Sequence, residues 1–321
     1  MKRQNYKTTR RNFFKKSLII GGIGFSSPII ANTILPNDSL KKKKTNNSNN
    51  CIKERLRNGK KIFHRIIVVG DPHWRDDHIS SELNRTPGLY ANNIHSKQRF
   101  DMMINWLNEE KQTEGTDFIV FNGDVATNRT EDLPIIKEQF EKLKSQYYVV
   151  HGNHDHSSEE NWKSLWGYGR NHSFSIGNYG IILLNSANEN GNYECADNKW
   201  LEPQLEAFKN KSGILVFCHI PQHGNSFIPE GLLCSATESL IKTPNVKMVV
   251  YSHEHLKDGF YAITRGNLQL KTFFTGHFSA WGLPYLGYRV IEIYDDGSII
   301  TYMFNPAEDI VNNFNLLKES T

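Results

Sequence analysis

Side chains that can bind metal ions follow five apolar segments of the sequence, directly where each segment ends. In YYVVHGNHDH, residues 147–156, a run of bulky apolar residues gives way at once to His, Asn and Asp. A loop that only reversed the chain would favour Gly, Pro, Ser or Asp for their backbone preferences. The segments IIVVG, FIVFNG, ILVFC and MVVYS end in the same way, and the full set is Asp71, His73, Asp124, Asn153, His154, His219, His253 and His255.

This set of side chains has a defined chemistry. Carboxylates and imidazoles together suit divalent metals such as Zn, Mn and Fe, and the set contains none of the thiolates that form structural zinc sites. The ligands are too many for one catalytic ion with an open position, but they suit two ions that share a carboxylate. Two ions about 3.5–4 Å apart can activate water and bind both the attacking and the leaving oxygen of a phosphate ester.

Apolar segments alternate with amphipathic ones along the chain, which is typical of βαβ units with parallel strands. The alternating segments are 65–70, 96–111, 117–124, 131–146 and 147–151. In open α/β sheets, binding sites form beyond the carboxyl ends of the strands, so the ligand side chains are expected to converge. We therefore predict an α/β fold with a two-sheet sandwich flanked by helices, in a single catalytic domain over residues 59–310 with a C-terminal tail at 311–321.

Five short motifs carry a resemblance to a known family. In chain order they are Asp71-Pro72-His73, Gly123-Asp124, Gly152-Asn153-His154-Asp155, His219-Ile220-Pro221 and Ser252-His253-Glu254-His255. Their order and their positions at strand ends resemble the calcineurin-like metallophosphoesterase family, over roughly residues 62–256. The resemblance implies a metal-dependent phosphoric ester hydrolase, either a phosphodiesterase or a phosphomonoesterase (phosphatase), that acts through a metal-bridging hydroxide.

The resemblance also implies a role for each matching residue. Seven would be metal ligands: Asp71, His73 and His255 for the first metal, Asn153, His219 and His253 for the second, and Asp124 for both. His154 would act near the leaving group as a proton donor or charge stabiliser, with Asp155 orienting its ring. The cofactors would be two divalent or mixed-valence ions among Fe, Mn and Zn.

Some positions depart from the family pattern. Ser252 stands where the family usually has Gly, and a positive φ at that position would cost a serine about 1 kcal/mol or more. Thr127 stands where the purple acid phosphatase branch carries an iron-binding Tyr, so no iron–tyrosinate colour is expected. His151 replaces the usual Pro, and we interpret it and His156 as loop residues at the rim of the site.

Four residues are candidates for contact with the substrate: Trp74, Arg75, Arg170 and His223. Trp74 and Arg75 begin a long loop after the first motif, and long loops in compact domains are often binding loops. Packing of Trp74 against the protein is an equal alternative. His223 lies four residues after His219, and Arg170 lies just beyond the third motif.

The charge of the chain is unevenly distributed. Residues 1–60 hold 15 Lys and Arg against 2 Asp and Glu, whereas residues 61–321 hold 23 against 32. The body is therefore acidic, so no nucleic acid partner is indicated, and a small or medium phosphoester is the expected substrate. The alternative is a non-catalytic ligand-binding or metal-sequestering protein on the same fold. Loss of one of the seven metal ligands would indicate a binding protein, and all seven are present.

The N-terminal segment has the features of an export signal. Residues 9–15, TRRNFFK, resemble the twin-arginine signal, and the moderately apolar stretch that follows is too short and too polar for a good transmembrane helix. We predict a signal peptide at 1–31, a disordered basic and Asn-rich linker at 32–58, and no stable membrane span after cleavage. The twin-arginine export machinery would then be a partner, and the location periplasmic or extracellular.

The four cysteines follow no metal or redox spacing. Export would permit a disulfide, but the sequence assigns no connectivity. The twin-arginine route carries folded proteins, which makes dependence on a disulfide less expected. Cys218 lies in an apolar segment and is predicted to pack in the core.

Overall fold

The computed structural model describes residues 57–74, 94–223, 233–255, 257–276, 287–306 and 310–317, together with Glu54, Leu89, Tyr90 and Phe278. The chain divides into two units, residues 1–46 and 47–321, and every described residue belongs to the second unit. The predicted signal peptide and most of the predicted linker lie outside the described residues, as does Arg75. No helix in the described part of the chain is long and apolar enough to cross a membrane.

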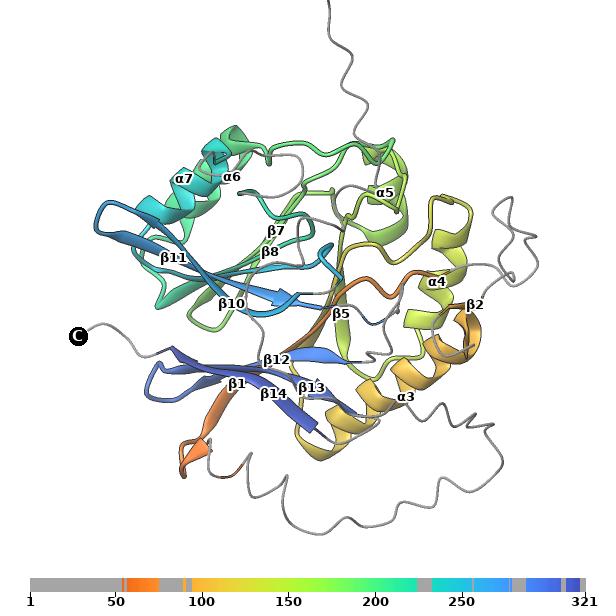
Figure 1. Cartoon of the computed structure of the whole chain (residues 1–321), viewed down its shortest axis with the longest axis horizontal. Helices are drawn as coiled ribbons and strands as arrows, with labels where there is room; N and C mark the ends of the chain where they lie inside the picture. The colour runs from red at the N-terminus through yellow and green to blue at the C-terminus, as the bar shows by residue number, and fades with distance from the viewer. Residues whose placement is uncertain are drawn as a thin grey trace, which may run out of the picture. The chain divides into compact units, whose positions relative to one another are not determined.

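Two mixed six-stranded sheets pack face to face in the second unit (Figure 1). The first sheet has the order β14(Ile310–Leu317), β13(Ile299–Asn305), β12(Tyr288–Tyr294), β1(Ile62–Val69), β4(Phe118–Asn122), β5(Gln146–Val150). The second has the order β10(Asp258–Arg265), β11(Leu268–Thr275), β9(Val246–Tyr251), β8(Gly213–Cys218), β7(Tyr179–Leu184), β6(His172–Ile176). A further pair joins β2(Leu89–Tyr90) to β3(Ile94–His95).

The central strands of both sheets run parallel, as the alternation of strands and helices predicts. β1, β4 and β5 are parallel neighbours in the first sheet, and β7, β8, β9 and β11 are parallel neighbours in the second. The carboxyl ends of each parallel set therefore share one edge of their sheet. Antiparallel hairpins extend the sheets, including β12–β13, which turns at Gly297 with a φ of 79°.

Helices cover the outer face of each sheet. α3(Ser96–Thr113) and α4(Asp132–Phe140) pack on the first sheet, α6(Asn198–Ala207) and α7(Ser235–Lys242) pack on the second, and α5(Glu159–Trp166) follows β5 (Figure 1). The alternation along β1 shows how the sequence builds this arrangement. Ile67 and Val69 face the helices, while Ile66 and Val68 face the other sheet. The predicted two-sheet sandwich flanked by helices is confirmed.

The boundaries of the folded region differ from those predicted. Residues 311–317, assigned to a C-terminal tail, belong to the edge strand β14, which pairs with β13. The alternation of this segment is interrupted by Asn312 and Asn313, where the register shifts, so its strand character is weak in the sequence. Arg57, assigned to the linker, pairs with the buried Glu292 at 2.6 Å.

Cys195 and Cys234 form a disulfide, with a Cα–Cα distance of 5.6 Å and a sequence separation of 39 residues. The sequence could not assign this pair, because the sheet brings together two segments on either side of β8. Cys218 is a free thiol and fully buried in the core between the second sheet and its helices. Its predicted packing role is confirmed.

Glu292 of β12 is the centre of a buried ionic network. Its carboxylate accepts hydrogen bonds from Arg57 at 2.6 Å, from Arg65 at 3.3 Å, and from the hydroxyls of Tyr294 and Tyr302. Burial raises the pKa of Glu292, but these hydrogen bonds and positive charges outweigh burial and lower it below 4.5. The network therefore contributes stability above the ordinary pKa of a glutamate, and this contribution is lost as the pH falls through the lowered value.

We expect Glu292→Gln to lower the free energy of unfolding by about 2 kcal/mol near pH 7, because it removes the buried charge that Arg57 and Arg65 share. The loss is limited because Arg57 still pairs with Glu114 at 2.8 Å and Arg65 still pairs with Glu110 at 2.6 Å. The difference from the natural protein should shrink in acid, where Glu292 itself becomes protonated. Denaturant unfolding of both proteins across this pH range measures the effect. A difference that stays constant with pH would contradict the assignment.

Candidate metal centre

The predicted metal ligands converge at the edge where the parallel strands of both sheets end. Asp71 and His73 follow β1, Asp124 follows β4, His219 follows β8, and His253 and His255 follow β9, while Asn153 comes from the loop after β5. Two groups of these side chains have ligand atoms that all lie within 4.8 Å of one another. The first cluster is Asp71, His73, Asp124 and His255, and the second cluster is Asp124, His219 and His253.

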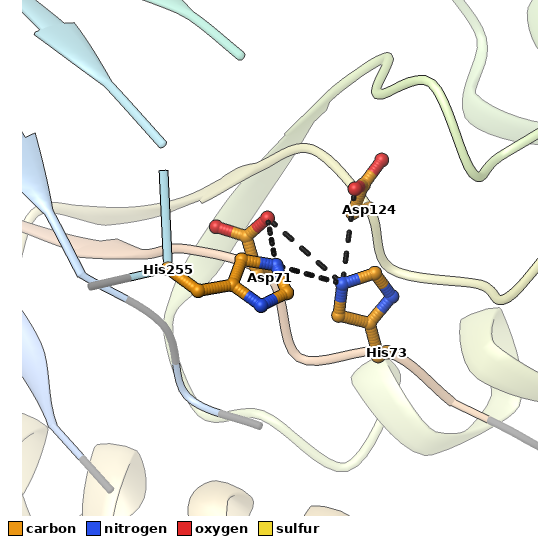
Figure 2. Close-up of side chains that lie close together, drawn as sticks. All are labelled: Asp71, His73, Asp124 and His255. Carbon is orange, nitrogen blue, oxygen red and sulfur yellow. Dashed lines mark hydrogen bonds and ion pairs between the residues drawn. The ribbon is translucent and has the colours of Figure 1, made fainter. Parts of the chain in front are cut away.

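The first cluster is compact and nearly closed to solvent. His255 Nε2 lies 3.2 Å from both Asp71 Oδ1 and His73 Nε2, and His73 Nε2 lies 3.7 Å from Asp124 Oδ2. Figure 2 shows these side chains pointing toward one another from the segments that follow β1, β4 and β9. Only His255 is partly exposed, with 14% of its side chain accessible, so the open side of the cluster is at His255.

The second cluster shares Asp124 with the first. His219 Nε2 lies 3.1 Å from Asp124 Oδ2 and also 3.1 Å from the side-chain oxygen of Asn153. His219 is held by its other ring nitrogen, since Nδ1 donates to the carbonyl of Asn122 at 2.9 Å. A carbonyl acceptor on the far ring nitrogen is the usual way in which a metal-binding histidine is oriented.

The side chains fit a pair of metal ions. Asp124 Oδ2 is buried without a hydrogen bond among the described residues, although it lies between the Nε2 atoms of His73 and His219. A buried carboxylate oxygen without a donor is costly unless a cation satisfies it. The nitrogen and oxygen donors match those preferred by Zn, Mn and Fe, the ions predicted for this site.

Four of the ligand residues have left-handed backbone conformations. The φ angles are 47° at Asp71, 45° at His73, 54° at Asp124 and 64° at His253. Each costs a non-glycine residue about 1 kcal/mol or more, and such conformations persist where the surroundings enforce them. Glycines permit the close packing around these residues: a Cβ on Gly152 would lie 2.2 Å from the amide nitrogen of Asp124.

Ser252 does not have a positive φ, so it does not carry the backbone strain that such an angle would impose on a serine. The positive φ belongs to His253, and the hydroxyl of Ser252 lies 2.8 Å from Thr275 Oγ1 and accepts from Asn122 Nδ2 at 3.0 Å. Asn122 also donates to the carbonyls of Cys218 and Val250, both at 3.2 Å. Asn122 therefore joins the ends of β4, β8 and β9 beneath the metal ligands. In the sequence it is marked only as a polar residue in an apolar strand.

The charges of the cluster shift one another's ionisation. Burial lowers the pKa of His219, but the adjacent charge of Asp124 outweighs burial and raises it to about 9. Burial raises the pKa of Asp124, but His219 and His154 outweigh it and hold it well below its usual value. Burial lowers the pKa of His73 to about 3. In the metal-free protein at neutral pH, His219 is therefore protonated and His73 is neutral.

Metal affinity should accordingly depend on pH. Because a metal ion requires the neutral imidazole of His219, binding displaces its proton, and the affinity should fall by up to about tenfold for each unit of pH below the pKa. Titration of the metal-free chain with Mn²⁺ between about pH 6.5 and 8.5, with proton release measured in parallel, tests this. An affinity that does not change over this range would contradict the protonated state of His219.

His154 lies beside the shared carboxylate but is not oriented as predicted. Its Nδ1 lies 2.6 Å from the side-chain oxygen of Asn128, and its Nε2 lies 4.0 Å from Asp124 Oδ2. Asp155, predicted to orient this ring, instead accepts from the backbone amides of Gly152 at 2.7 Å, Ala126 at 2.9 Å and Asp124 at 3.1 Å. The prediction for Asp155 was wrong, because its fully buried carboxylate is occupied in holding the two ligand loops together.

Asn128 was missed by the sequence analysis. It is exposed, has a φ of 60°, and lies four residues after Asp124 in a loop of ordinary composition. Asn is one of the few residues that tolerate this conformation, but that preference signals a turn and not a site. Only the fold shows that the loop after β4 brings Asn128 to His154.

Of the substrate candidates, Trp74, Arg170 and His223 are described by the structure and lie outside the two clusters. Trp74 is buried and packs edge-on against Phe100 with ring centroids 4.9 Å apart, in agreement with the packing alternative. Arg170 Nε donates to Glu159 at 3.1 Å. His223 stacks on Tyr261 at 6.0 Å, and burial with the charge of Lys257 lowers its pKa to about 4.

His151 is not a rim residue. It is fully buried and lies edge-on to Trp162 at 4.9 Å, behind the loop that carries Asn153. Its Nδ1 donates to the side-chain oxygen of Asn185 at 3.0 Å. Burial and the charge of Arg170 lower its pKa to about 3, so the ring is neutral. The interpretation of His151 as a loop residue at the rim was wrong; it supports the ligand loop from behind.

Comparison with known proteins adds to this geometry. A family model described as calcineurin-like phosphoesterase matches residues 64–257. A probable glycerophosphodiester phosphodiesterase GpdQ from Arcobacter nitrofigilis is 34% identical over 117 residues, which are 33% of this chain and 42% of that protein. The chain thus matches less than half the length of this curated relative.

Solved structures share the fold at low sequence identity. A dimetal phosphatase from Danio rerio superposes with a TM-score of 0.59 at 12% identity, covering 81% of this chain and 100% of that one. The purple acid phosphatase PPD1 from yellow lupin (Lupinus luteus) seeds superposes with a TM-score of 0.58 at 12% identity, covering 79% of this chain and 53% of that one. These two likenesses support the architecture of two sheets and flanking helices.

Proposed function

The chain belongs to the calcineurin-like phosphoesterase family, and on this premise we propose that it hydrolyses phosphodiesters at a centre of two metal ions. The observation that carries the proposal is the shared carboxylate of Asp124, which is common to both ligand clusters. The preference for diesters is supported by the partial likeness to a protein named as a probable glycerophosphodiester phosphodiesterase.

The two clusters would hold the ions, with Asp71, His73 and His255 on one side and His219, His253 and Asn153 on the other. Bound ions of this kind supply a nucleophile from water at neutral pH and neutralise charge on the phosphoryl oxygens. The remaining work belongs to the side chains of the protein. Asp155 and Asn122 fix the loops, and the carbonyl of Asn122 fixes the ring of His219.

His154 would supply a proton to the leaving alkoxide. Because Nδ1 donates to Asn128, the ring is held with Nε2 toward Asp124. A proton on Nε2 would pass to the departing oxygen, which otherwise leaves as a strongly basic alkoxide. The partly exposed ring, with 21% of its side chain accessible, leaves room for a substrate at this position.

Hydrolysis of paired chromogenic phosphate monoesters and diesters by the Mn²⁺-loaded chain tests the proposal, with Asp124→Asn as the inactive control. A preference for the diester that the substitution abolishes is the expected result. A preference for the monoester would make the protein a phosphatase. Absence of turnover with two metal ions bound would favour a non-catalytic binding or metal-sequestering protein.

We also propose export, on the basis of the twin-arginine-like residues Arg10 and Arg11. The disulfide between Cys195 and Cys234 supports this, since disulfides persist in oxidising compartments. Fractionation of cells that express the full chain should place the protein beyond the cytoplasmic membrane. The paired substitution of Arg10 and Arg11 by Lys should retain it in the cytoplasm, and equal export of both forms would contradict the proposal.

A further inference from the structure

The loop of residues 185–196, here called the bracing loop, contacts the segments that carry Asn153 and His219, two of the residues predicted to bind the second metal ion. It connects β7 to α6, and Cys195 near its end forms the disulfide with Cys234, which precedes α7. No role in metal binding follows from its sequence, because it contains no residue of the metal-binding motifs.

Asn185 and Gly191 of the bracing loop lie against the segment that carries Asn153. Asn185 accepts from His151 at 3.0 Å, and its amide is fixed in orientation because Nδ2 donates to the carbonyl of Ala187 at 2.8 Å. Gly191 lies directly against Asn153: a Cβ at this glycine would be 2.2 Å from the Asn153 carbonyl oxygen. The backbone of Gly191 has a φ of 77°, so only a residue without a side chain fits there.

The two ends of the bracing loop hold the segment that carries His219. Ser186 Oγ accepts from the amide of Ile220 at 3.0 Å, and the amide of Ala196 donates to Gln222 Oε1 at 2.7 Å. Ser186, Ile220 and Gln222 are all buried, so these hydrogen bonds are protected from water.

The disulfide closes this arrangement into a ring. The amide of Cys234 donates to the carbonyl of Gln222 at 3.3 Å, so the disulfide ties the bracing loop back to the segment that follows His219. Tyr193 of the same loop places its hydroxyl 3.0 Å from Cys234 Sγ. Cys195 is exposed, which gives a reductant access to the bond.

The loop that carries Asp71 and His73 is supported differently. The amides of His73 and Trp74 donate to the carbonyls of Asp124 and Val125 at 2.9 and 2.7 Å. From α3, the buried Arg99 donates to the carbonyls of Pro72 and His73 at 3.1 and 2.8 Å. The disulfide is part of neither set of contacts.

We propose that the Cys195–Cys234 disulfide sets the affinity of the second metal position and leaves the first largely unaffected, so that the bracing loop is a redox-sensitive support for one half of the centre. The inference rests on the proposed function, since it presumes two metal positions. Reduction by a dithiol transfers two electrons and two protons to the disulfide, giving two cysteine thiols, while the reductant becomes a cyclic disulfide. The freed loop then no longer holds Asn153 and His219 at their spacing.

The test measures the affinity of the full chain for Mn²⁺ in three states. These are the oxidised chain, the chain reduced by dithiothreitol that is then removed, and the chain after reoxidation. Mn²⁺ is chosen because it prefers oxygen and imidazole ligands and binds thiols weakly. We expect reduction to weaken the second Mn²⁺ about 10–100-fold and the first by no more than about twofold, as is usual when a supporting contact of a ligand is lost. Reoxidation should restore the second ion.

A variant that retains the disulfide provides an independent measurement. Gly191→Ala should weaken the second Mn²⁺ selectively, because the new Cβ meets the Asn153 carbonyl. Gly115→Ala is the matched control, since Gly115 has a similar φ of 78° but nothing within 4 Å of a Cβ. Its Mn²⁺ binding should be unchanged.

The outcomes separate this inference from the proposed function. The inference would be overturned if reduction left the affinity of each ion unchanged, or if it weakened the binding of both ions to the same extent. Either result would leave the dinuclear centre intact. Failure of the oxidised chain to bind two ions would overturn the dinuclear centre and the inference with it.

Discussion

Asp124→Asn is expected to lower hydrolysis by roughly 10³-fold or more, because the loss of charge stabilisation by the metal pair amounts to several kcal/mol. Asp124 is the one residue that both clusters share, and its Oδ2 lies 3.7 Å from His73 Nε2 and 3.1 Å from His219 Nε2. An amide at this position has the same shape but no charge, so both metal positions lose their common anionic ligand.

The measurement combines turnover with the number of metal ions bound per chain. Asp101→Asn is the matched control: Asp101 is a solvent-accessible carboxylate on α3 that pairs with Lys97 at 2.9 Å and with Lys142 at 3.8 Å. Its loss should change stability by less than about 1 kcal/mol and leave turnover unchanged. An Asp124→Asn protein that holds two ions and turns over at the natural rate would remove Asp124 from the centre.

His154→Ala is expected to retain both metal ions and to lose about 10²–10⁴-fold in kcat, the usual contribution of a positioned acid catalyst. Removal of the ring leaves the loop in place, because the backbone amide of His154 donates to Asp124 Oδ1 at 2.8 Å. Asn128→Ala should have a smaller effect of about tenfold, since it removes only the contact that orients the ring.

The comparison with a neighbouring histidine makes this result specific. His156 lies two residues away and its ring packs near Gly191, so His156→Ala should change kcat far less than His154→Ala. Equal losses in the two variants would indicate general disturbance of the loop. Loss of metal from His154→Ala would make His154 a determinant of metal binding and contradict its role as an acid.

The position of the ligands could be predicted because strand ends are simple to recognise. A run such as FIVFN before Gly123-Asp124 is buried on both faces, and in a parallel sheet its polar end must lie at the ligand-binding edge. The same reasoning brings Asp71, His219 and His253 to one place without any knowledge of distances. The two-sheet architecture follows from the alternation of strands and helices.

The contacts that orient these ligands could not be predicted, because they join residues that are far apart in sequence. The side chain of Asn122 reaches Val250, 128 residues away, and no local pattern in either segment signals it. The role expected for Asp155 was wrong for a related reason. Sequence proximity favoured a contact with His154, whereas burial directed the carboxylate to three backbone amides.

The arrangement of the ligands across both sheets has a mechanical consequence. Asp71, His73 and Asp124 extend from the first sheet, whereas His219, His253 and His255 extend from the second. Metal ions bound among them would act as cross-links between the two halves of the sandwich, at one edge only. Under a pulling force applied to both sheets at this edge, coordination bonds in the metal-loaded protein would resist separation of the sheets. In the metal-free protein, the sheets would separate first at this edge.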